Sequence, residues 1–171
     1  MGSYFSSPLT LFVLSVFSLL VFPARLQATE ISGTISSTLT ITENSELVGD
    51  VTCMVVGAPC ISFGSSGIKL RLNGFTITGS ATDCTAATAS TFGIVVTGQH
   101  NVAILGPGLV QKFAVFGVAL NGANKVRVEG LTASDNCFSG IFLAGTTDSD
   151  IEKNVSVRNS IASKGNPCGG T

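Results

Sequence analysis

The sequence has few charged residues and no tryptophan. Charged side chains make up 11% of the 171 residues, the net charge is −1, and histidine occurs once. Without a basic stripe to meet a polyanion, we expect no nucleic-acid partner. Because Glu, Lys and Arg are the usual residues of surface helices, their scarcity disfavours a helical fold. The 20 glycines instead favour a strand-rich chain with many tight turns.

A short apolar run opens the chain. Residues 9–22 are apolar apart from three hydroxyl residues, and a proline follows. A run of this length does not readily span a bilayer as a helix, and Ala28 suits cleavage by signal peptidase. We therefore expect residues 1–28 to be a signal peptide and residues 29–171 to be one secreted domain. The segment before the run lacks Lys and Arg, so an uncleaved leader that contacts the membrane stays open as the alternative.

The cysteines fit an oxidising compartment, in which disulfides persist. They are Cys53, Cys60, Cys84, Cys137 and Cys168. Cys-x-x-Cys pairs are absent, and a zinc site would have to join widely separated ligands to the one histidine, His100, so we expect no metal and no other cofactor. A local disulfide between Cys53 and Cys60 is sterically possible. The odd number leaves one thiol over or means that its partner is missing.

The stretch from Phe92 to Asn159 nearly repeats itself at a step of 23 or 24 residues. The similar pieces are Phe92-Gly-Ile-Val-Val96, Phe116-Gly-Val-Ala-Leu120 and Ser139-Gly-Ile-Phe-Leu143. Alternation within them predicts two inward columns, one of Ile94, Val118 and Ile141 and one of Val96, Leu120 and Leu143. One such unit cannot bury its apolar face alone, so the units must stack in parallel ladders. We expect about six coils of roughly 24 residues.

A column of turn-forming residues lies between the second and third strand of each unit. Its members are Gly74, Gly108, Gly130 and Asn154. These residue types enter the left-handed backbone conformation at least cost, so we expect the same bend at the same corner of each coil. Asn136 and Asn159, one repeat apart, predict an internal ladder of stacked amides. An insertion at residues 80–90 should leave the stack as a loop from one corner.

These features resemble the right-handed parallel β-helix repeat proteins of the pectin lyase-like superfamily. The resemblance is carried by the leader, the coil length, the corner residues, and the signatures Leu72-Asn-Gly-Phe-Thr-Ile77 and Phe138-Ser-Gly-Ile-Phe-Leu143. It covers the chain from about residue 31 to the end and implies an all-β, right-handed parallel β-helix. It implies no single function, because that superfamily includes polysaccharide lyases, glycoside hydrolases, epimerases, adhesins and proteins without known activity.

The catalytic patterns that the resemblance implies are not met. Lyases of this fold hold calcium with clustered acids, for which the candidates here are Asp148, Asp150 and Glu129, a set more typical of solvated turns. Related hydrolases place acids near Gly-His and Arg-x-Lys, whereas this chain has Gly98-Gln-His100 without an adjacent acid pair. We expect no catalytic residue, and leave open a lyase or hydrolase whose catalytic coils lie beyond residue 171.

Four basic residues form the candidate binding strip. Lys69, Arg71, Lys125 and Arg127 occupy matching outward positions, with Lys69 aligned to Lys125 and Arg71 to Arg127. Such a strip could bind an acidic polysaccharide. However, any strand with one face in solvent also places polar residues at alternating outward positions. The expected function is therefore a structural or carbohydrate-contacting surface. Thr-x-Thr pieces at residues 38–42 and 76–78 suggest a third hypothesis, in which threonine ladders bind ordered water on ice. These pieces fall in different registers, which disfavours it.

The end of the chain predicts a further coil. Cys168-Gly169 corresponds to Ser139-Gly140, the opening of the preceding coil, and no capping element follows. We therefore expect a fragment of a longer helix. Cys137 and Cys168 would then bridge neighbouring coils, and Cys84 would pair with Cys53 or Cys60. Asn154-Val-Ser156 matches a glycosylation sequon, but the expected turn at the corner of the coil already explains why an asparagine occurs at position 154.

Overall fold

The computed structural model describes residues 2, 28–81, 84 and 91–160. The expected signal peptide, most of the insertion and the chain end with Cys168 therefore lie outside the described residues. Within them the chain forms thirteen strands and no helix, which confirms the all-β prediction. The described part accordingly contains no helix long and apolar enough to cross a membrane.

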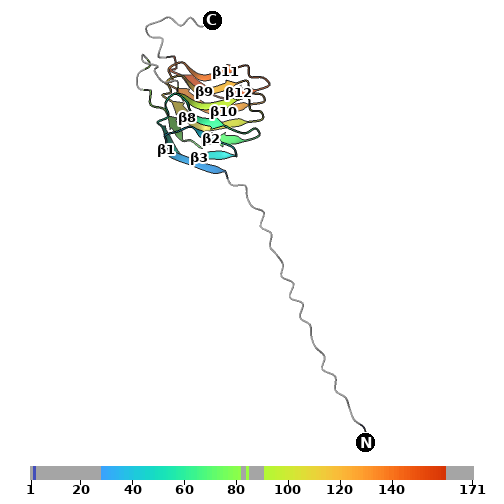
Figure 1. The fold of residues 1–171 in the computed structure, drawn as a ribbon. Helices are drawn as coiled ribbons and strands as arrows, with labels where there is room; N and C mark the ends of the chain where they lie inside the picture. The colour runs from blue at the N-terminus through green and yellow to red at the C-terminus, as the bar shows by residue number, and fades with distance from the viewer. Residues whose placement is uncertain (1, 3–27, 82–83, 85–90, 161–171) are drawn as a thin grey trace.

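The strands form two parallel sheets, which we call sheet A and sheet B. Sheet B contains β2 (Leu39–Ile41), β4 (Pro59–Phe63), β7 (Phe92–Thr97), β9 (Phe116–Asn121) and β11 (Ser139–Ala144). Sheet A contains β1 (Thr29–Ile35), β3 (Ser45–Cys53), β5 (Lys69–Arg71), β6 (Thr76–Thr78), β8 (Ala103–Gln111), β10 (Arg127–Ser134), β12 (Asp150–Glu152) and β13 (Val155–Val157). Successive strands of each sheet stack in layers along one direction (Figure 1). This arrangement is compatible with a β-solenoid.

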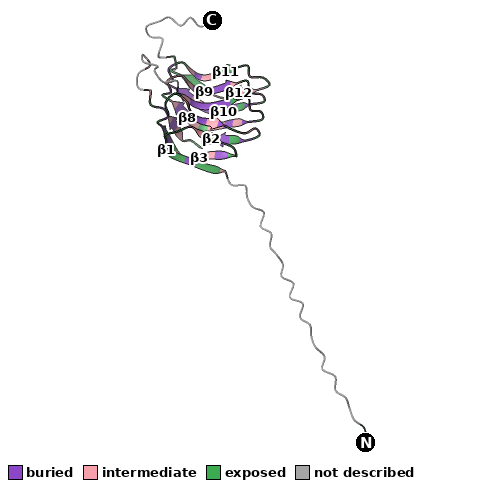
Figure 2. Ribbon diagram, viewed as in Figure 1, coloured by how far each residue is buried: buried purple, intermediate pink, exposed green. Residues whose placement is uncertain are grey.

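The register of sheet B confirms the alignment of the two predicted inward columns, but their last members are less well buried, and Leu143 is 44% exposed on the last strand of the described sheet. Ile94 pairs with Val118, and Val118 with Ile141, while Val96 pairs with Leu120 and Leu120 with Leu143. Ile94, Val96, Val118 and Leu120 are fully buried. In sheet A, β5 alternates between exposed and buried residues, whereas β7 and β9 of sheet B are each buried over four successive residues (Figure 2). Each fully buried Val, Leu or Ile contributes about 1.5–3 kcal/mol, so the stacked columns are the main source of stability.

The predicted corner is only partly correct. Gly74 and Gly130 have the expected left-handed backbone, with φ of 88° and 71°. In the last repeat Lys153 takes that conformation instead, with φ of 57°, one residue before Asn154. Gly108 is required by close approach, because a Cβ there would lie 2.3 Å from the Cβ of Leu72. One alignment column thus contains residues selected for different physical reasons.

Asn154 serves the stack through its side chain. Its Oδ1 accepts a hydrogen bond from the backbone N–H of Leu131 at 2.9 Å, and its Nδ2 donates to the backbone oxygen of Val128 at 2.8 Å. Both partners lie one repeat earlier, on β10. The Asn154 amide therefore joins two repeats, and a glycan on Nδ2 would compete with its bond to Val128.

The asparagine ladder is confirmed where β10 leads into β11. Asn136 is fully buried, and its Nδ2 donates to Oδ1 of Asn159 at 3.0 Å and to the oxygen of Val110 at 3.3 Å. Its Oδ1 accepts from the N–H of Phe113, one repeat earlier, at 3.1 Å. With the bonds from Asn159 to the backbone of Ala133 and Asn136, the ladder satisfies backbone groups of two successive repeats, and its Asn136 rung is fully buried.

The disulfide prediction is wrong for one pair and right for the other. Cys53 and Cys60 are bonded, as the short loop allowed, with 5.9 Å between their Cα atoms. Cys137, however, is bonded to Cys84 of the insertion, with 5.3 Å between Cα atoms, and not to Cys168. The insertion is long enough to carry Cys84 to the corner before β11, a path that the spacing of cysteines does not reveal. Two disulfides fit an oxidising compartment.

Candidate functional site

In sheet A, most of the charged side chains that point outward lie on β5, on β12 and on the N-terminal end of β10. Two columns run across β5, β8, β10 and β12 in register. One column contains Lys69, Ala103, Arg127 and Asp150, and the other contains Arg71, Leu105, Glu129 and Glu152. The residues between them, such as Leu70 and Val128, are fully buried. We call this outward surface, together with Lys153 in the turn after β12, the charged face.

The predicted alignment of the basic strip is wrong by two residues. Lys69 and Arg127 both pair with Ala103, whereas Arg71 and Glu129 both pair with Leu105. Lys125 lies in the turn before β10, with φ of 54°. The cause is the turn between β9 and β10. It includes Lys125, so β10 begins only at Arg127, and Arg127 takes the register position that Lys69 holds on β5. The basic residues therefore alternate with acids and do not form one continuous strip.

Arg127 and Lys153 are both engaged by carboxylates. Arg127 Nη2 lies 2.7 Å from Glu129 Oε2 and 3.1 Å from Glu152 Oε1, and Lys153 Nζ lies 2.7 Å from Glu129 Oε1. The hydrogen bond from Lys153, together with the charge of Arg127, lowers the pKa of Glu129. The same hydrogen bond raises the pKa of Lys153. Glu129 therefore stays ionised and holds two cations in place, an arrangement unlike that of a general acid.

A shallow depression lies on the charged face beside these ion pairs. Its volume is about 390 Å³, and it is lined by Arg71, Leu105, Gly106, Pro107, Glu129, Gly130 and Lys153. Its floor is backbone, since a Cβ on Gly106 would lie 2.0 Å from the oxygen of Gly130. In the described part of the chain, Arg71 forms no ion pair. The depression thus presents one uncommitted guanidinium and one shared ammonium to a ligand.

The three acids considered for calcium do not converge. Asp148 accepts a hydrogen bond from Asn124 Nδ2 at 2.9 Å, Asp150 lies opposite Arg127, and Glu129 is bound to cations. Across residues 28–81, 84 and 91–160, no three His, Cys, Asp or Glu side chains form a group able to hold a metal ion. Hard oxygen ligands that are paired with cations or amides give little attraction for calcium.

His100 links two neighbouring turns. Its Nδ1 lies 2.9 Å from Ser66 Oγ, and its own backbone N–H donates to the same oxygen at 3.0 Å. In the described chain, no carboxylate forms a hydrogen bond or ion pair with the imidazole, and Ser66 Oγ already accepts a backbone hydrogen bond. The pair therefore ties one repeat to the next and lacks the third group that activates a serine nucleophile.

The threonine pieces lie on different sheets, but a threonine column exists that the sequence interpretation missed. Thr40 is in β2 of sheet B, whereas Thr76 and Thr78 form the ends of β6 in sheet A. Thr34, Thr52 and Thr78 stand in register across β1, β3 and β6, and the column continues with Gln111. The run of hydroxyls is therefore three strands long and ends at an amide.

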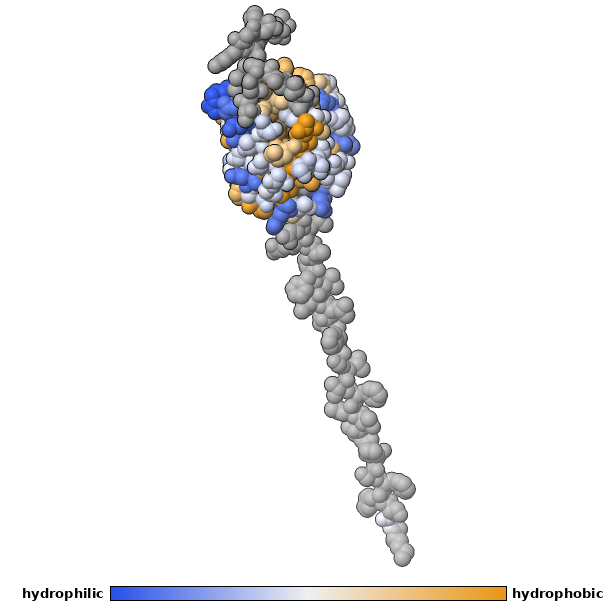
Figure 3. Space-filling model, turned by 60° about the vertical axis from the view of Figure 1, so that its left-hand side comes forward, coloured by the Kyte–Doolittle hydropathy of each residue, from blue (hydrophilic) through white to orange (hydrophobic). Residues whose placement is uncertain are grey.

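An aromatic stripe on the outside of sheet B was also missed. Its members are Phe92, Phe116, Phe138 and Phe142. Phe116 is central, stacked on Phe142 with ring centroids 4.2 Å apart, and Phe138 is 48% exposed. The recurrence of Phe at 92, 116 and 138 was the signal that could have revealed it. Figure 3 shows apolar residues gathered in patches on one face of the molecule, and not spread evenly.

Comparison with known proteins adds no relative. No protein-family model, no curated protein and no solved structure matches this chain. The functional argument therefore depends on the residues of the chain itself.

Proposed function

We propose that the chain is a secreted right-handed parallel β-helix of the pectin lyase-like kind, whose charged face contacts an acidic polysaccharide without catalysing its cleavage. The stacked parallel sheets and the two disulfides support the first part of this proposal. The observation that carries the second part is the depression between Arg71 and Lys153.

A uronate carboxylate suits this depression chemically. Arg71 can bind a carboxylate through two parallel N–H donors, and Lys153 adds a second cation on the opposite wall. Glu129 restrains Lys153, so the ammonium pays less conformational entropy when a ligand arrives. Because the depression is shallow and open, we expect several weak contacts along a polymer and not one tight site for a monosaccharide.

The test is binding of the purified chain to immobilised polygalacturonate and alginate. We expect retention of the wild-type chain on at least one of them, and weakening of roughly fivefold to tenfold in Arg71→Gln, the loss of one charge-assisted contact. Lys125→Gln is the matched control, since it removes the same charge from a turn outside the depression. Equal retention of all three proteins would refute the charged face as the contact site. Release of unsaturated sugars during the assay would instead indicate a lyase.

A further inference from the structure

Sheet B has an outer surface of different chemistry. None of its five strands contains a charged residue. Its aromatic stripe lies across three successive repeats, with centroid distances of 5.8 Å between Phe92 and Phe116 and 6.5 Å between Phe116 and Phe138. We propose that the aromatic stripe binds the apolar face of a neutral, unbranched polysaccharide chain.

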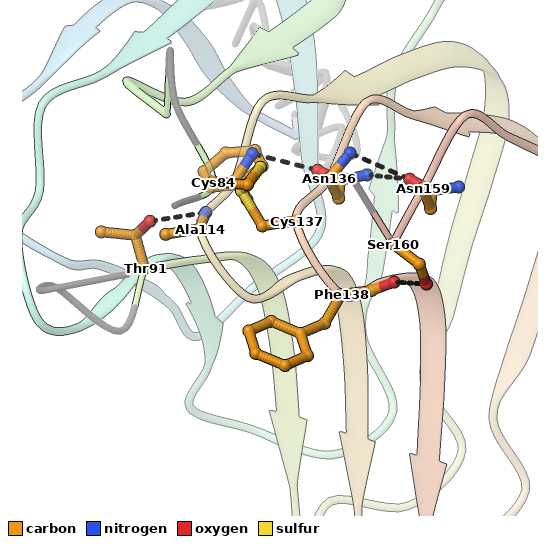
Figure 4. The surroundings of a disulfide bond; sticks show 9 residues. Cys84, Thr91, Ala114, Asn136, Cys137, Phe138, Asn159 and Ser160 are labelled. Atoms are coloured by element: carbon orange, nitrogen blue, oxygen red, sulfur yellow. Dashed lines mark hydrogen bonds between the residues drawn. A yellow bond between two sulfur atoms is a disulfide. The ribbon is translucent and has the colours of Figure 1, made fainter. Parts of the chain in front are cut away.

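The rings of the stripe pack together, so Phe138 is exposed whereas Phe92, Phe116 and Phe142 are half-buried. Phe142 stacks on Phe116 at an interplanar angle of 7°, and Ala119 and Val95, which stand in register with Phe142 on β9 and β7, are buried. Phe138 is held differently. It lies just before β11, where its backbone N–H donates to the oxygen of Val115, and its ring points away from the Cys84–Cys137 disulfide (Figure 4). Roughly half of the Phe138 side chain is therefore accessible on a fixed backbone.

The dimensions favour a linear polymer over a protein. A stable protein interface buries about 800 Å² on each partner, whereas a phenylalanine offers about 150–250 Å² in total. Four rings would offer about 600–1,000 Å² if fully accessible, and because three of them are already half-buried, the accessible area is below that of a stable protein interface. A sugar chain needs only a strip one ring wide, and the stripe follows the direction in which the strands stack (Figure 1).

The chemistry favours a neutral sugar. A pyranose presents a face of C–H groups that packs on aromatic rings, and its hydroxyls point outward from its edges. Thr97 and Asn121 stand in register two residues beyond Val95 and Ala119, and they supply a hydroxyl and an amide on the Phe142 side of the stripe. A uronate would lose the hydration of its carboxylate here without gaining a cation. The surface is thus distinct in ligand class from the charged face.

The test measures binding of cellohexaose to the full chain by calorimetry. We expect binding by the wild type and a loss of at least about fivefold in Phe138→Ala, since aromatic anchors dominate such contacts. Phe138→Leu keeps an apolar side chain without a ring, so it should fold as the wild type does and still bind weakly. Val155→Ala is the control, because Val155 is equally exposed but lies on sheet A.

Two results would overturn this inference. One is absence of wild-type binding to cellohexaose, xylohexaose and mannohexaose, or binding that Phe138→Leu and Phe138→Ala leave unchanged. The other is a concentration-dependent dimer, seen by sedimentation and lost in Phe138→Ala, which would assign the stripe to a second copy. Neither result bears on retention by polygalacturonate through Arg71, so the two proposals can fail independently.

Discussion

The charged face and the aromatic stripe lie on the two sheets of the same stack and follow the same alternation. In both, inward residues such as Leu70 and Ile94 are fully buried and differ little in kind. Their outward neighbours differ completely: ion pairs around Glu129 on sheet A, and rings around Phe116 on sheet B. The comparison teaches that stacking constrains the inward positions of a repeat and leaves the outward ones free to acquire separate surface chemistries.

The largest expected effect tests whether both surfaces belong to one cooperative unit. Asn136 lies where β10 of sheet A leads into β11 of sheet B. Replacing it by leucine leaves the N–H of Phe113 and the oxygen of Val110 without their partners. We expect Asn136→Leu to lower the free energy of unfolding by about 3 kcal/mol, measured by urea titration.

The control for this change is Asn121→Ala on the surface of β9, which should shift the free energy of unfolding by less than about 0.5 kcal/mol. Binding to polygalacturonate and to cellohexaose should weaken together as Asn136→Leu unfolds. If the two activities were lost at different urea concentrations, the surfaces would belong to separate units and the comparison would fail.

The next largest effect is a difference between the two surfaces in how strongly salt weakens binding. Contacts with the charged face are exposed and are screened by ions, whereas contacts with the rings are not. Raising NaCl from about 0.05 M to about 0.5 M should weaken retention on polygalacturonate by roughly tenfold. Binding of cellohexaose should change by less than about twofold, because apolar burial is insensitive to ionic screening. Equal salt dependence of both ligands would show that they share one surface.

The smallest effect concerns acid. The bidentate hydrogen bond from Arg158, with Nε and Nη2 each 2.8 Å from an Asp135 oxygen, lowers the pKa of Asp135 to about 2. A lowered folded-state pKa gives stability that is present above the unfolded value near 4 and is lost as the pH falls toward 2. Since Arg158 is exposed, we expect Arg158→Gln to lower the free energy of unfolding at pH 5 only slightly.

The difference between wild type and Arg158→Gln should shrink as the pH is lowered from about 4 to about 2, as followed by urea titrations at each pH. Arg71→Gln is the comparison variant, because Arg71 forms no ion pair in the described chain and should show no such pH dependence. A constant difference for Arg158→Gln down to pH 2 would contradict the role of Asp135.

The sequence predicted the interior well because burial imposes a period. Val118 and Leu120 must lie over Ile94 and Val96, and any slip would expose them. The ladder of Asn136 and Asn159 was predictable for the same reason, since a buried amide needs a partner at each repeat. Interior positions are constrained from both neighbouring repeats, so a single sequence suffices to find them.

The surface was predicted less well because it lacks that constraint. The register of Lys125 and Arg127 depends on where a turn ends, and no buried residue in the turn marks that point. The bond of Cys84 to Cys137 depends on the path of an insertion. Phe92, Phe116 and Phe138 did recur visibly, but core and surface aromatics look alike until their direction is known.

The Cys84–Cys137 disulfide has a consequence for how the stack comes apart. Arrays of repeats usually fray from an end, one unit at a time, because each unit contacts only its neighbours. This bond joins the segment before β7 to the segment before β11, and thereby encloses β7, β8, β9 and β10 in one covalent loop. The bond fixes Cys137, at the entry to the last repeat, to the segment that precedes β7. Fraying from that end can therefore release β11, β12 and β13, whereas β7 to β10 stay tied together at Cys84 and Cys137.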